Sequence, residues 1–183
     1  MSGLHHMLVH FPLVFWALAT LMILIGALLP GRMAELSRAA LLPVLVLSLL
    51  AALVAITSGL LVWPIEASTS SPLARNHILT ALWSLGVFSM LTVLVWRAGS
   101  TAFDGARRWV LLLLALIGIS IFATTGTIGG HLVGATTQFS ELLKLFGWDV
   151  YHTFFVPTWV IAVMVLIGIV CAVLGLKGRR AAL

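Results

Sequence analysis

Charged residues are scarce in this chain of 183 residues, since they make up only 8% of it, whereas 62% of the residues are hydrophobic. With a mean hydropathy of +1.20, this composition excludes an ordinary soluble domain and indicates an integral membrane protein. The single cysteine, Cys171, lies inside an apolar run. The chain therefore has no internal disulfide, no paired-cysteine metal motif and no motif for covalent haem attachment.

Acidic residues are also few, and all five lie in predicted loops or at the ends of predicted membrane spans. An ion-coupled or proton-coupled transporter is expected to carry carboxylates within the membrane, so this absence disfavours transport. A phosphate-binding glycine loop is missing as well, and nothing in the sequence supports hydrolysis or group transfer. We expect a protein that transfers electrons or binds a partner rather than one that makes or breaks bonds.

Five apolar runs are each long enough to cross a hydrocarbon core of about 30 Å. They cover about residues 7–29, 39–63, 73–97, 109–133 and 150–176, and they predict a single all-α domain, a bundle of five transmembrane helices. Residues 32–38 are predicted to form a short charged turn, and residues 135–149 a segment lying in the membrane interface. The first run lacks a basic leading region, so we expect it to be retained as a span and not removed as a signal peptide.

The basic residues predict the orientation of the bundle. With five spans, eight of the ten fall on one side, and only Arg75 and Lys144 fall on the other. Because short cytoplasmic loops are rich in Lys and Arg, the N-terminus is predicted to be periplasmic and the C-terminus cytoplasmic, in a bacterial inner membrane. The net charge of +5 thus reflects topology, and it is not a sign of nucleic-acid binding.

All six histidines fall on the predicted outer side. His5, His6 and His10 open the first span, His77 opens the third, His131 closes the fourth and His152 opens the fifth. Any one of them alone is readily explained as an interfacial histidine that reaches for water. Histidines at the ends of four different spans, all on the same side of the membrane, favour a common binding site instead.

Neutral imidazole binds zinc, copper and haem iron. His6 and His10, four residues apart on one helical face, favour a compact copper or zinc site, whereas haem in a helix bundle takes single histidines from different helices. The second distribution predicts His10, His77, His131 and His152 as ligands of the iron, with His5 in reserve.

Three further residues are candidates for cofactor binding. Gly130 and Gly134, with Gly126, recur at every fourth position beside His131, which indicates either close helix packing or room for a flat macrocycle. Arg75, two residues before His77, is a candidate partner for a haem carboxylate, and it is equally suited to anchor a phospholipid.

The stretch His5-His6-Met7-Leu8-Val9-His10-Phe11-Pro12 resembles the H-P-x-x-V-H-F-P signature of the bacterial membrane family known as domain of unknown function 2231. Asn76-His77 and Gly129-Gly130-His131-Leu132-Val133 resemble the two later marks of that family. The resemblance implies a small haem b protein of respiratory electron transfer, because some relatives carry a Rieske iron–sulfur domain. It marks His5, His10, His77 and His131, although His6 replaces the usual proline and the fifth span lies beyond it.

Together these features predict a membrane b-type cytochrome subunit with one or two bis-histidine haems in the outer leaflet. It would relay electrons between quinone and a periplasmic cytochrome, iron–sulfur or molybdenum subunit, within a hetero-oligomeric complex. Two alternatives stay open: a copper- or zinc-binding membrane protein, and a cofactor-free anchor of a respiratory complex.

Overall fold

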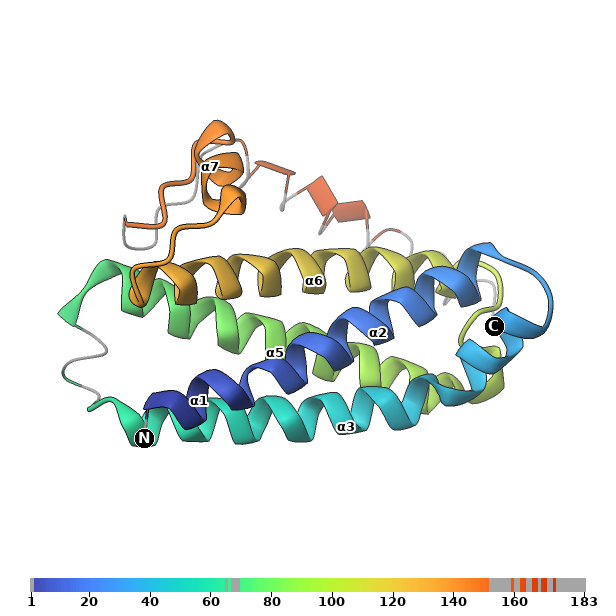
Figure 1. Ribbon diagram of the computed structural model, residues 1–183. Coiled ribbons are helices and arrows are strands. Elements are labelled where there is room, and N and C mark those ends of the chain that lie inside the picture. The colour runs from blue at the N-terminus through green and yellow to red at the C-terminus, as the bar shows by residue number, and fades with distance from the viewer. Residues whose placement is uncertain are drawn as a thin grey trace.

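The computed structural model describes residues 2–64, 66 and 70–151, together with 159, 162, 163, 166, 167, 169, 170 and 173. The described chain is helical and contains no strand. Four long helices lie side by side as a bundle: α2 (His10–Leu28), α3 (Arg32–Val62), α5 (Pro72–Ala98) and α6 (Arg107–Leu132) (Figure 1). All four are long and apolar enough to cross a membrane, so this is a multi-pass membrane protein.

The first four predicted spans are confirmed as helices, and their bounds are close to those expected except at the start of α3. The predicted charged turn at 32–38 is wrong, because α3 begins at Arg32 and passes through these residues without a break. Leu29, Pro30 and Gly31 connect the two helices, with Gly31 at a φ of 87°, and the Arg, Met, Glu and Leu residues that follow are good helix formers. The predicted fifth span, 150–176, lies mostly outside the described residues.

The first span is bent near its start. A short helix, α1 (Ser2–Leu8), is separated from α2 by Val9 alone. Pro12 explains the bend, since it has no N–H to donate to the carbonyl of Leu8 and its ring crowds that carbonyl. The next helical hydrogen bond, from Leu13 N to Val9 O, is long at 3.4 Å. The bend separates the histidine-bearing α1 from the axis of α2, and α1 packs against α3.

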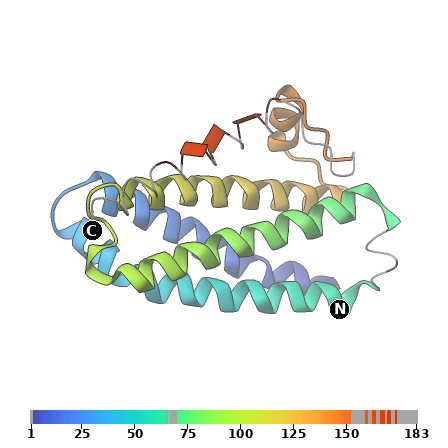
Figure 2. The same cartoon turned by 180° about the vertical axis from the view of Figure 1, so that it is seen from behind.

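Two short elements complete the described structure. A single turn of 3₁₀ helix, η1 (Gly99–Thr101), follows α5, and α7 (Gln138–Leu145) follows α6. Figures 1 and 2 show α7 outside the bundle, beside the end of α6. Leu145 on α7 is 84% exposed, in keeping with the predicted interfacial segment at 135–149.

The centre of the bundle is an aromatic stack. Trp16 of α2 lies parallel to Phe88 of α5, with ring centroids 4.6 Å apart and an angle of 9° between the planes, and Phe122 of α6 meets Trp16 edge-on. Both Trp16 and Phe88 are almost completely buried. The stack therefore holds the two halves of the bundle together at mid-height.

Replacing Trp16 with alanine is expected to destabilise the protein by about 3 kcal/mol, because it leaves a cavity beside Phe88 and Phe122. Leu18→Ala is the control on the same helix. Leu18 is 40% exposed on the outer face, and its truncation is expected to cost less than about 1 kcal/mol. Unfolding in mixed micelles of rising denaturing-detergent content measures both, and equal losses would contradict a central stack.

Candidate functional site

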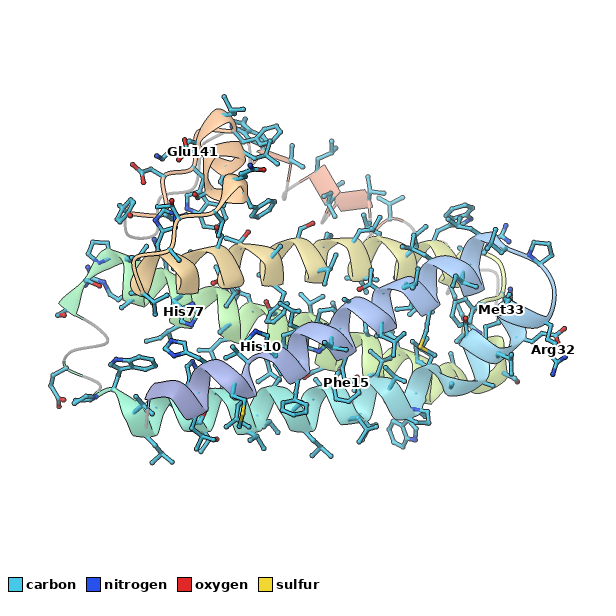
Figure 3. The ribbon with its side chains drawn as sticks, viewed as in Figure 1. His10, Phe15, Arg32, Met33, His77 and Glu141 are labelled. Atoms are coloured by element: carbon cyan, nitrogen blue, oxygen red, sulfur yellow. The ribbon has the colours of Figure 1, made fainter. Side chains whose placement is uncertain are left out.

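Three of the histidines gather at one end of the bundle, where α1 begins, α3 ends, α5 begins and α6 ends. Figure 3 places His77 and His10 in the half that holds the N-terminus, and Arg32 and Met33 at the opposite end. Arg97, Arg107 and Arg108 lie at that opposite end too, because they flank the turn from α5 to α6. Apart from Arg75, the described arginines thus lie at the end of the four helices opposite the histidines.

His5, on α1, is buried with 8% of its surface exposed. Its Nδ1–H donates to the carbonyl of Ala55 on α3 at 3.0 Å, and the hydroxyl of Ser58 lies at the same distance. The ring packs directly on Gly59, where a Cβ atom would come within 2.8 Å of His5 Cε1. Trp63 covers the ring edge-on, with centroids 5.3 Å apart.

His77, on α5, is held in the same way by α6. Its Nδ1–H donates to the carbonyl of Thr125 at 3.1 Å. The ring packs on Gly129, where a Cβ atom would lie 3.2 Å from His77 Cε1. Each of these two rings therefore reaches a carbonyl four residues before a glycine on the neighbouring helix.

His131, near the end of α6, is 9% exposed, and its Nδ1 lies 2.6 Å from the hydroxyl of Tyr151. Its Nε2 is buried and has no hydrogen-bond partner among the described residues. An imidazole nitrogen taken out of water without a partner is costly, so this atom is a strong candidate to bind a ligand.

The hydrogen bonds of His5 and His77 determine which nitrogen carries the proton. A main-chain carbonyl can only accept, so each Nδ1 carries the hydrogen, and in the neutral ring the lone pair lies on Nε2. Neither Nε2 makes a hydrogen bond within the described chain. Metal-binding histidines in proteins are typically prepared in this way, with one ring nitrogen anchored and the other left for the metal.

His10 and His6 lie differently. His10 is exposed on α2, and its Nδ1–H donates to the carbonyl of His6 in its own helix at 2.7 Å. His6 is also exposed, and its ring meets Trp63 edge-on at 6.2 Å. Among the described residues no three His, Cys, Asp or Glu side chains come together as a metal site, so His5, His6 and His10 do not converge here.

The predicted glycines have other roles in the backbone. A Cβ atom at Gly130 would lie 2.7 Å from the carbonyl oxygen of Ala135, and Gly134 has a φ of 79° in the turn after α6. Both positions thus need glycine for the chain to turn after His131. Gly126 faces open space.

The remaining candidates lie around the start of α5. Arg75 is half-buried in the first turn, two residues before His77. Asn76 is buried and donates from its side chain to the carbonyl of Val150 at 3.0 Å, which fixes the segment carrying Tyr151 against α5. His152 lies outside the described residues.

Four residues of this site were not predicted: Ala55, Gly59, Thr125 and Gly129. Gly59 and Gly129 lie near the C-terminal ends of the second and fourth spans, at the end of the bundle that carries the histidines. This position could have marked them as candidates to contact a histidine. Glycine inside a span is common, however, and only the approach of a second helix shows which one faces a histidine.

No family model, curated protein or solved structure significantly matches this chain. The resemblance to domain of unknown function 2231 therefore stays a prediction, and the function is inferred from the site itself.

Replacing Gly129 with alanine is expected to displace the His77 ring and weaken its bond to Thr125, with a loss of about 1 kcal/mol in stability. Gly126→Ala, on the same helix and facing open space, is the matched control and is expected to be neutral or stabilising. Thermal unfolding in detergent compares the two. Gly59→Ala should cost more than Gly129→Ala, because its Cβ comes closer to the ring it faces.

Proposed function

We propose that this protein is a membrane b-type cytochrome subunit that relays electrons through one or two haems held at the histidine end of the bundle. The observation that carries the proposal is the buried, unpartnered Nε2 of His131. The anchored rings of His5 and His77, each leaving Nε2 without a hydrogen bond in the described chain, support it.

The donor set suits haem b better than a zinc or copper site. Structural and catalytic zinc sites draw three or four ligands together, often including carboxylate or thiolate. The donors here are single imidazoles on α1, α5 and α6, which is the distribution used for haem iron in helix bundles. Bound there, haem would supply reversible one-electron oxidation and reduction.

The chain's own residues would do three things at this site. His5, His77 and His131 would offer Nε2 to iron, and the carbonyls of Ala55 and Thr125 would orient two of those rings. His10, as an exposed residue, and His152, outside the described residues, are further candidates. Arg75 at the start of α5 is the candidate cation for a haem carboxylate.

The direction of electron exchange depends on the placement of the site. We propose that the arginine end of the bundle is cytoplasmic, which puts the histidine end at the periplasmic face of a bacterial inner membrane. A site confined to that face serves a quinone in the outer leaflet and a periplasmic partner, such as a cytochrome or an iron–sulfur or molybdenum subunit. The protein would then be the membrane subunit of a hetero-oligomeric complex.

A visible spectrum tests the cofactor. Purified protein is expected to show a sharp α-band in its reduced-minus-oxidised spectrum and to release haem b on extraction. His131→Ala should change the spectrum or lower the haem content, whereas His6→Ala, at an exposed position, should leave both unaltered. Copper or zinc without haem would support the metal-handling alternative, and a protein without any cofactor would support the anchor.

Cysteine labelling tests the orientation. In a Cys171→Ala background, Thr136→Cys at the histidine end should react with a membrane-impermeant maleimide in intact spheroplasts, because that end faces the periplasm. Ser100→Cys, in the turn at the arginine end, should react only after the membrane is permeabilised. The reverse pattern would place the site on the cytoplasmic side.

A further inference from the structure

The described bundle is built from two copies of the same helical hairpin. In the first helix of each half, several buried residues have a buried counterpart 72 positions further along the chain. The same spacing separates His5 from His77. The buried pairs in these helices are Pro12 and Ser84, Trp16 and Phe88, Ala19 and Leu91, and Ile23 and Val95. Four buried pairs in the same register mean that α2 and α5 turn the same face to the core.

In the second helices, α3 and α6, buried residues have buried counterparts 70 positions further along the chain. The same spacing separates Gly59 from Gly129. The buried pairs there are Leu41 and Leu111, Leu45 and Ala115, Ser48 and Gly118, and Ala55 and Thr125. Four buried pairs in each pair of helices thus keep a constant spacing, although few of the paired residues are identical and other positions, such as Met22 and Leu94, differ in burial.

The two copies are related by a two-fold rotation about the long axis of the bundle. In Figure 1, α2 crosses the front from lower left to upper right, and α5 crosses the back from upper left to lower right. The helix α3 lies along the lower edge and α6 along the upper edge, and Figure 2 shows the same relation from behind. Trp16 stacks on Phe88, the residue at the equivalent position of the other half. Two equivalent residues can touch in this way only where both lie next to the axis.

His5 and His77 are counterparts in this arrangement, and so are their surroundings. Ala55 and Thr125, which accept their hydrogen bonds, are 70 positions apart, as are the two glycines under the rings. The structure therefore anchors one imidazole in the same way in each half of the bundle, with Nδ1 bound to a carbonyl and Nε2 left over.

The other histidines have no such counterpart. The residue equivalent to His10 is Leu82, and both are exposed. The residue equivalent to His131 is Leu61, which is 79% exposed. His5 and His77 are therefore the one histidine pair that the symmetry of the described chain relates.

We propose that His5 and His77 would hold a single haem b between them, each offering its Nε2 to the iron from one of the two hairpins. This pairing rests on the proposed function and sharpens it, because it replaces the sequence-based preference for His10 with a residue matched to His77. His131 would then belong to a second, asymmetric site with Tyr151.

A double variant tests whether His5 and His77 bind the same haem, because the losses of haem caused by removing two ligands of one haem do not add. His5→Ala and His77→Ala should each remove the same single haem, so that the low-spin haem content falls by the same amount in both, and the double variant should lose no more than either one. His6→Ala, next to His5 on α1 and exposed, is the control and should retain the wild-type content. Two separate haems would instead give partial losses that add in the double variant, which would overturn the pairing and leave the proposed function intact.

Chemical rescue separates ligation from folding. In His77→Gly and His5→Gly, added imidazole should restore the low-spin spectrum of the purified variants after titration with hemin, because it replaces the missing ring in the space left beside Gly129 or Gly59. Variants that bind hemin normally without imidazole would overturn the pairing. Wild-type protein that binds no hemin at all would overturn the proposed function, and the pairing with it.

Discussion

The structure depends on the same type of hydrogen bond in each half of the bundle. In both cases the Nδ1–H of a histidine, His5 or His77, donates to a helix carbonyl four residues before a glycine. In a membrane bundle every main-chain carbonyl within a helix already accepts one bond, so a side chain has to use its second lone pair. The ring can do so only where the two helices come very close. The glycine allows this approach, and the ring is then fixed with Nε2 directed away from the carbonyl.

The repeated hairpin explains why the bundle has a site at one end. A two-fold axis along the bundle brings an aromatic pair together at mid-height, and it gives each half one anchored imidazole near the same ends of the helices. The first half needs Pro12 for this, because the bend after α1 accompanies the packing of the segment carrying His5 against α3. The second half has its histidine within an unbroken helix, α5.

The two halves differ in the chain segments that come after them. After α6 the chain turns at Gly134 and forms α7. It then returns to the bundle, where the Tyr151 hydroxyl contacts His131 and the Val150 carbonyl accepts a hydrogen bond from Asn76. The described residues after α3 form no comparable return. The histidine end therefore has one symmetric pair of imidazoles and one further imidazole with a tyrosine partner, and the two environments suit different roles.

Part of this was visible in the sequence. The first four spans, their approximate bounds and the separation of histidines from arginines follow from the hydrophobic runs and from where polar residues interrupt them, because a membrane span has a fixed minimum length. The start of α3 was missed, since a charged stretch is equally compatible with a turn and with a helix that emerges from the membrane. Gly130 and Gly134, predicted either to pack closely against a helix or to leave room for a macrocycle, also serve the turn after His131.

The sequence by itself determined the class of the protein, the number of described spans and the end at which the histidines lie. The tertiary structure alone decided which histidines turn inward. His5 and His10 are five residues apart and lie on different faces, so that one meets α3 and the other is exposed. Helical periodicity does not say which face meets a neighbour when both are apolar, and only the packing of α1 on α3 and of α5 on α6 settles it.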